Sequence, residues 1–228
     1  MKLRNVFAAG LIAASLLPTF AKAADITFDV VSTPVIAGNA AKIEFKGSPL
    51  FSIAFPNAGN GFDFTISNGS DSGFDGLSGN IGGTFTVGAI TINGPMQDAP
   101  VTGTGIFSIF DGATTLTAAL TWDSIFSVGT TTALNFNAVA NLTNVTYAGT
   151  NAALQSIVTS IDPTFNLSAQ FGRTMSLTQL MTAAHTTTTT YSGSFAAQPV
   201  PEPSTYALMI VGLAVAGVAA RRRKIVQG

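Results

Sequence analysis

Apolar and polar residues alternate strictly in several runs along the middle of this chain. A two-residue period places one set of side chains on a core face and the other toward water, so each run predicts a β-strand. Threonine is abundant and β-branched, which also favours strands. The runs contain Ile26–Val30, Phe62–Ile66, Leu116–Trp122, Leu134–Leu142 and Phe165–Phe171.

Turn-forming residues separate these runs, for example at Asn57–Gly61, Asn93–Pro95 and Asp111–Gly112. Several short strands divided by such turns predict an all-β domain, either an antiparallel β-sandwich or a barrel, since both have the same alternation. A change of phase around Gly88 indicates a β-bulge. The threonine-rich segment His185–Tyr191 is expected to form part of a last strand.

One short helix is expected within the strand-rich region, at Asn151–Ile161. The side chain of Asn151 is suited to cap its N-terminus, and the Asp162-Pro163 dipeptide is expected to stop it. A shorter helical turn is expected within Leu177–Ala184.

The first 23 residues have the three parts of a secretory signal peptide. Lys2 and Arg4 provide the positive region, and Val6–Leu17 is almost wholly apolar but too short to span a bilayer. Ala21 and Ala23 are the small residues that a signal peptidase recognises, so we expect cleavage after Ala23. The predicted organisation is a signal peptide at 1–23, an extracellular β domain at 24–197 and a sorting tail at 198–228.

The charge of the central segment limits its partners. Ala24–Val200 contains ten acids but only three bases, Lys42, Lys46 and Arg173, which gives a formal net charge of −7. Because nucleic acids are bound mainly through Lys and Arg, this balance excludes them as expected partners. The chain has no cysteine, so neither disulfides nor thiol chemistry contributes.

Residues suited to catalysis or metal binding are scarce. The one histidine, His185, stands beside the threonine run, where a solvent-facing position is the simpler interpretation. Asp71–Gly76 is faintly similar to a calcium loop, but Gly82 stands where the bidentate glutamate belongs. Trp122 alternates in phase with Leu116 and Leu120, which predicts a buried side chain and not a platform for stacking on a sugar. We therefore predict no catalytic residue, no metal site and no cofactor.

The C-terminal tail combines three features in a fixed order. Pro201-Glu202-Pro203-Ser204 comes first, and residues 204–220 contain no charge. At 1.5 Å per residue these 17 residues span about 26 Å, which predicts a transmembrane helix. Four basic residues follow and predict the cytoplasmic side of a membrane stop: Arg221, Arg222, Arg223 and Lys224.

This order resembles the PEP-CTERM sorting signal of Gram-negative bacteria, and the resemblance covers Val200–Lys224. It implies an exosortase substrate, processed near Pro201-Glu202-Pro203 and associated with exopolysaccharide and biofilm. Its processing enzymes are then signal peptidase and exosortase. The implied location is a transient inner-membrane anchor with the domain outside, followed by the cell surface or extracellular matrix.

Three functions remain open for the β domain. The first is a non-enzymatic surface or matrix protein. The second is a carbohydrate-binding module, which requires an exposed aromatic platform, with Phe51, Phe55 and Phe107 as candidates. The third is a secreted hydrolase that uses a pair of aspartates in a cleft.

Overall fold

A computed structural model of the chain describes residues 25–32, 42–47, 51–56, 61–128, 134–171, 176–184, 186–199 and Leu213. The chain divides into two units, one comprising Met1–Ala23 with Pro201–Gly228 and the other Ala24–Val200. All strands and both short helices that the structure describes belong to the second unit.

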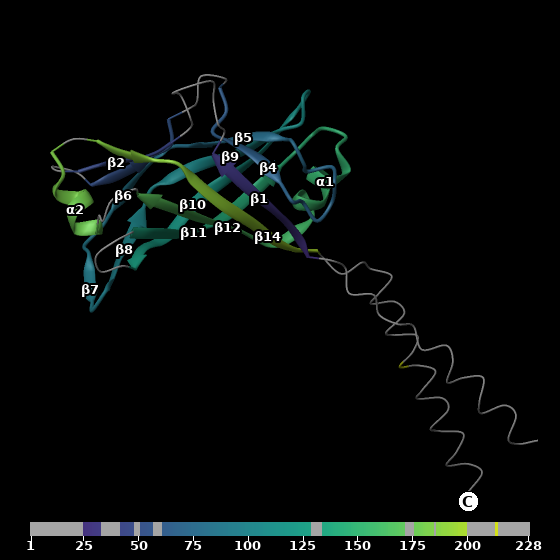
Figure 1. Cartoon of the computed structure of the whole chain (residues 1–228). Coiled ribbons are helices and arrows are strands. Elements are labelled where there is room, and N and C mark those ends of the chain that lie inside the picture. The colour runs from purple at the N-terminus through teal and green to yellow at the C-terminus, as the bar shows by residue number, and fades with distance from the viewer. Residues whose placement is uncertain are drawn as a thin grey trace, which may run out of the picture. The chain divides into compact units, whose positions relative to one another are not determined.

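Eight antiparallel strands of this unit close into a ring (Figure 1). Their order around the ring is β11, β12, β14, β1, β4, β5, β9 and β10, and β10 pairs again with β11. The strands are β1 (Ile26–Ser32), β4 (Phe64–Ser67), β5 (Ser78–Gly82), β9 (Thr104–Phe110), β10 (Thr115–Val128), β11 (Leu134–Thr146), β12 (Ser160–Phe171) and β14 (Tyr191–Pro199).

A second group of strands branches from the long strand β10. The first half of β10 pairs with β9, whereas Ser124–Val128 pairs with β8. The branch then continues in the order β8 (Met96–Thr102), β6 (Thr84–Val87), β3 (Ser52–Ala54), β2 (Ile43–Lys46) and β13 (Thr187–Thr189). The strand β6 pairs with the last two residues of β8, and β7 (Thr91–Asn93) pairs with its first three. The fold is thus a closed barrel with a lateral extension, and the sandwich alternative is wrong.

Two short helices lie at opposite ends of this domain (Figure 1). They are α1 (Ala152–Val158) and α2 (Leu177–Thr182). Gln97 on β8 accepts hydrogen bonds from the backbone N–H and the hydroxyl of Thr178, which fastens α2 to the branch.

Phenylalanine rings fill the centre of the barrel. Phe28 and Phe195 stack with centroids 4.5 Å apart, and Phe107 contacts both Phe64 and Phe165. The branch shares this core, because its aromatic residues pack on Trp122 of β10 and Tyr191 of β14. The buried, core-facing position predicted for Trp122 is confirmed.

The structure confirms the predicted alternation in most strands and corrects it in one. Phe62 was expected to share the core phase of Phe64, with Asp63 turned outward. Instead Phe62 is partly exposed and Asp63 is 1 % exposed. Phe62 precedes β4, so the strand's alternation does not extend to it.

The predicted helix at 151–161 is confirmed at its start and wrong at its end. The Asn151 side chain accepts hydrogen bonds from the backbone N–H groups of Ala153 and Leu154. The helix ends at Val158, however, and Asp162-Pro163 lies within β12, where the pairing with β14 shifts register between Ile161 and Thr164. Such an irregularity is where a proline, which cannot donate a ladder hydrogen bond, is tolerated within a strand.

The predicted bulge at Gly88 and the predicted helical turn near 177 are both present. Three residues, Gly88–Ile90, face two residues of β8 between the pairs Val87–Val101 and Thr91–Asp98. The threonine run forms β13, which is separate from the last strand β14. No helix in the described part of the chain is long and apolar enough to cross a membrane.

Candidate functional site

The residues predicted to act in processing lie outside the described residues. They are Ala21, Ala23, Pro201, Glu202, Pro203, Ser204, Arg221, Arg222, Arg223 and Lys224. The predicted transmembrane segment 204–220, apart from Leu213, and His185, for which a solvent-facing position was expected, also lie outside the described residues. The described domain must therefore be considered by its own surface features.

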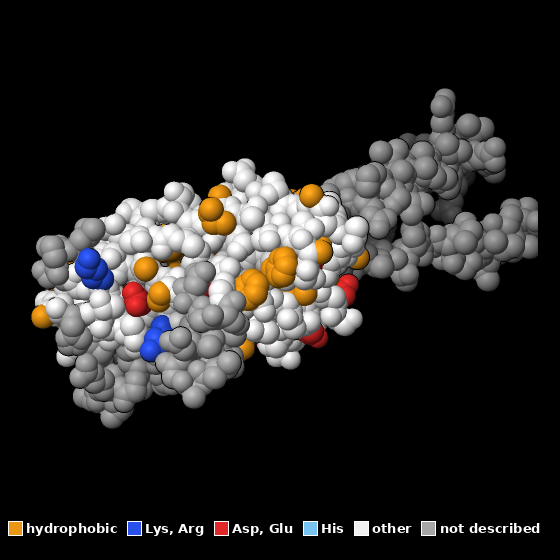
Figure 2. All heavy atoms as spheres, turned by 90° about the horizontal axis from the view of Figure 1, so that it is seen from above, with side chains coloured by type: hydrophobic (Ala, Val, Ile, Leu, Met, Phe, Trp, Pro, Cys, Tyr) orange, Lys and Arg blue, Asp and Glu red, His pale blue; other side chains and the backbone are white. Residues whose placement is uncertain are grey.

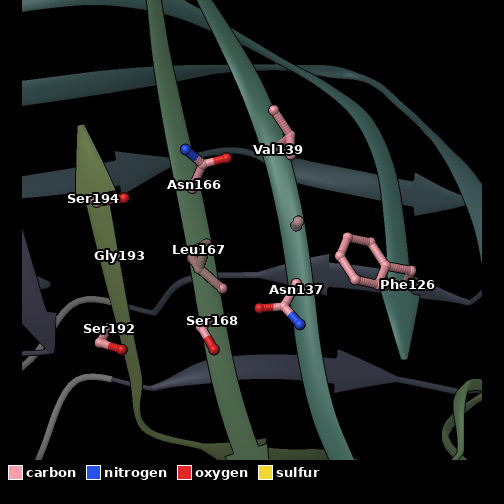
Figure 3. A pocket seen from close by; sticks show the side chains of 10 residues that line it. Phe126, Asn137, Val139, Asn166, Leu167, Ser168, Ser192, Gly193 and Ser194 are labelled. Carbon is pink, nitrogen blue, oxygen red and sulfur yellow. The ribbon is translucent and has the colours of Figure 1, made fainter. Parts of the chain in front are cut away.

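One of these features is a groove of about 410 Å³ on the outer face of the barrel. It crosses β10, β11, β12 and β14 (Figure 3). Its lining side chains are mostly uncharged and polar, with one aromatic ring at the side formed by β10: Phe126, Asn137, Val139, Asn166, Ser168, Ser192 and Ser194. Ala138, Leu167 and Gly193 alternate with them and form the floor.

The strand register arranges these side chains in two parallel rows across the sheet. In one row Phe126 pairs with Asn137, which pairs with Ser168, which pairs with Ser192. In the other, Ser124, Val139, Asn166 and Ser194 are paired in the same way. Directly paired residues of antiparallel strands point to the same face, so both rows face outward with their partly or fully exposed side chains.

A bulge in β10 places Phe126 in the groove. The pairing of β10 with β11 shifts register between Trp122 and Ser124, which leaves Asp123 as the extra residue. Before the shift the even-numbered residues point into the core, and after it Ile125 and Ser127 do so. The inserted residue therefore turns Phe126 outward, next to Asn137.

The groove has the chemical groups that suit a sugar. Within the described part of the chain, the side chains of Asn137, Asn166 and Ser168 make no hydrogen bond to protein, so their donors and acceptors face solvent. The face of Phe126 offers an apolar surface on which the C–H groups of a sugar ring can pack. A few polar groups beside an apolar wall are typical of small-molecule and oligomer sites.

A smaller hollow of about 270 Å³ lies elsewhere on the outer face. Phe62 and Phe110 stack there with centroids 5.9 Å apart and an interplanar angle of 18°. Asn80, Ser108 and Thr115 complete the lining with Gly79. This hollow repeats the combination of aromatic ring, amide and hydroxyl.

The aromatic residues proposed from the sequence for sugar binding are not on the surface. Phe51 and Phe55 are each 5 % exposed and Phe107 is fully buried, so these three candidates are wrong. The sequence analysis missed Phe62, Phe110 and Phe126. The break in alternation at Asp123 was the signal that would have revealed Phe126.

Asp63 is the one buried carboxylate among the ten acids of the domain, all of which the structure describes. Its Oδ2 accepts a hydrogen bond of 2.8 Å from the N–H of Ile81, whereas Oδ1 has no partner among the described residues. Burial raises the pKa of Asp63 to about 6, and the bond from Ile81 opposes this rise. Tyr191 donates to the Asp63 carbonyl at 3.2 Å, and burial followed by the charge of Asp63 raises its pKa.

The other acids are exposed or half-buried, and no three acidic or histidine side chains of the described part form a metal-binding group. Asp71 and Asp75, the residues of the faint calcium-like loop, accept hydrogen bonds from Gly73 and Gly69 of the same loop. Their role is to hold this turn.

A further acid closes the turn between β9 and β10. Asp111 accepts hydrogen bonds from the N–H groups of Thr114 and Ala113 and from the hydroxyl of Tyr147. The Thr114 bond, followed by the Tyr147 bond, holds the pKa of Asp111 below its usual range. Tyr147 in turn accepts from the N–H of Asn151 at 3.0 Å, so this network joins the turn to the start of α1.

Comparison with known proteins identifies the tail. Residues 199–224 match the PEP-CTERM protein-sorting motif. The motif indicates an exported protein that exosortase sorts to the surface, which confirms the resemblance found in the sequence. No curated protein and no solved structure matches the chain.

Proposed function

We propose that this chain is a non-enzymatic protein of the cell surface or extracellular matrix that associates with exopolysaccharide in a biofilm. The observation that carries the proposal is the uncharged, sugar-compatible groove on an exported domain. Its amide and hydroxyl groups are partly or fully exposed beside Phe126, and those of Asn137, Asn166 and Ser168 make no hydrogen bond within the described part of the chain. The acidic domain has few side chains placed for chemistry, and Asp63 is buried alone.

The processing route follows from the ends of the chain. Signal peptidase cuts after Ala23, and the helix at 204–220 then holds the protein in the inner membrane with its domain outside. The prolines of Pro201-Glu202-Pro203 keep this segment extended, which gives a protease access to it. Exosortase cleavage there releases the domain to the surface or matrix.

The groove also favours the narrower alternative of a carbohydrate-binding module. In that case the groove, and not the general surface, accounts for attachment to the matrix. The chain then binds one polysaccharide by defined contacts to Phe126 and Asn137.

Titration of the full chain with the exopolysaccharide of its own bacterium tests this function. We expect Phe126→Ala to weaken binding by about tenfold, because loss of about 60 Å² of apolar contact corresponds to about 1.5 kcal/mol. The control is Ile106→Ala, which removes an exposed apolar side chain of β9 that lies outside both the groove and the smaller hollow. No binding by either protein refutes the proposal, whereas equal binding by wild type and the Phe126 variant refutes the groove as the binding site.

A further inference from the structure

The dimensions of the groove fit an extended chain that crosses the strands. Its two rows run perpendicular to β10, β11, β12 and β14, and neighbouring strands lie about 4.8 Å apart. This spacing is close to the length of one sugar ring. A polysaccharide laid along the rows therefore meets one new pair of outward side chains for each successive sugar.

The same rows continue beyond the groove on both sides. On the far side of β10, Asp98 of β8 pairs with Phe126. On the far side of β14, Asp29 of β1 pairs with Ser194. Because paired residues share a face, the row that contains Phe126 ends at Asp98, and the row that contains Ser194 ends at Asp29 on the opposite side. The path of the ligand therefore has a carboxylate at each end.

No positive charge of the described residues compensates these acids near the groove. Lys42 and Lys46, the only bases of the described part, flank β2, which is separated from β10 by β3, β6 and β8. Figure 2 shows the blue lysine atoms at one end of the domain, the end that carries β2 and α2 in Figure 1, and few charges elsewhere on that face.

The backbone of the groove cannot replace a basic side chain. β11, β12 and β14 each pair with a neighbour on both sides, so their N–H groups are used in the ladders. Binding a carboxylate, sulfate or phosphate normally takes Arg, Lys or unpaired N–H groups, since a desolvated anion requires strong donors. The serine hydroxyls and asparagine amides suit neutral hydroxyl and amide groups instead.

We propose that this groove selects a polysaccharide without negative charge, one built of neutral or amino sugars, and rejects polymers of uronic acids or other anionic sugars. This inference rests on the proposed function, because it names the ligand class of the same groove. Asp98 and Asp29 provide the selection, since they repel anionic chains and attract protonated amines.

Ion exchange separates the exopolysaccharide of the producing bacterium into neutral, cationic and anionic fractions. These fractions are the probes. Each fraction is titrated against the full chain at low and at physiological salt. We expect binding to the neutral or cationic fraction and none to the anionic one. Preferential binding of the anionic fraction overturns the inference while leaving the proposed function intact, and binding of no fraction overturns both.

Two variants locate the selection in the groove. Asp98→Lys is expected to reduce affinity for the cationic fraction by about twofold to fivefold and to permit weak anionic binding, as expected for one partly exposed charge. Glu44→Lys, the same charge change on β2, is the control and is expected to alter neither the affinity for the cationic fraction nor the binding of the anionic one. If both variants act equally, the selection comes from the overall charge of the domain, and the inference is wrong.

Discussion

Asp63 provides the sharpest test of the physical interpretation of this fold. It is 1 % exposed, and only one of its carboxylate oxygens accepts a hydrogen bond within the described structure. Replacing it by asparagine keeps the size of the side chain and the acceptor for the Ile81 N–H, and removes the ionisable group. The substitution therefore isolates the free-energy cost of a buried negative charge.

The magnitude follows from the shift in pKa. Burial raises the pKa of Asp63 from 3.8 to about 6, so the folded protein holds this proton more tightly than the unfolded chain does. The resulting stabilisation is complete below pH 3.8 and is lost as the pH rises through about 6. About two pKa units correspond to at most about 3 kcal/mol in the free energy of unfolding.

Urea denaturation of the wild type and of Asp63→Asn across pH 3.5 to 8 measures the contribution of Asp63 to the free energy of unfolding. The quantity of interest is the difference between the free energies of unfolding of the two proteins. It should move by about 2–3 kcal/mol in favour of the variant between pH 4 and pH 7. Asp123→Asn, at an exposed acid, is the control and should show no such movement. A difference for Asp63→Asn that stays constant over this range refutes the reasoning.

Three further predictions follow from the core, the turn network and the tail. Phe107→Ala should lower the free energy of unfolding by about 3–5 kcal/mol, because Phe107 packs on Phe64 and Phe165; a loss below about 1 kcal/mol contradicts this packing. Tyr147→Phe should lower the melting temperature, because Asp111 and Asn151 both lose a partner, and an unchanged temperature means that the network is not stabilising. Protein recovered from the surface fraction should begin near Ala24 and end near Glu202 by intact mass, whereas a mass that includes Arg221–Gly228 indicates a permanent anchor.

The strand content of the domain was predictable because alternation is a local property. Strands β1, β10, β11 and β12 all contain the predicted runs, and Asn151 caps α1 as its side-chain chemistry requires. The choice between sandwich and barrel was not predictable, because it depends on which strands pair. The ring requires the pairings of β1 with β14 and of β5 with β9, which are not consecutive strands, and nothing in the alternation of these strands indicates those contacts.

The burial of Asp63 shows how tertiary contacts override a local pattern. The sequence Phe62-Asp63-Phe64 alternates as a strand should, which predicts an exposed Asp63. In the structure Phe62 instead stacks on Phe110 of β9, a residue 48 positions further along the chain. Asp63 then lies against Ile81 and Tyr191, whose N–H and hydroxyl hydrogen-bond its carboxylate and its carbonyl. No feature of the sequence near Asp63 predicts these partners.

The outward position of Phe126 depends on the bulge at Asp123. Had the alternation of Leu116–Trp122 continued through β10, Phe126 would point into the core and Ser127 would face the groove. The extra residue at Asp123 exchanges these positions, so a phenyl ring is exposed beside Asn137 and the small Ser127 is buried. Exposing a large apolar side chain and burying a hydroxyl both cost stability. A bulge that is unfavourable on both counts is explained if Phe126 serves binding. Deletion of Asp123 should preserve polysaccharide binding, because Ser124 then still pairs with Val139 and Phe126 with Asn137.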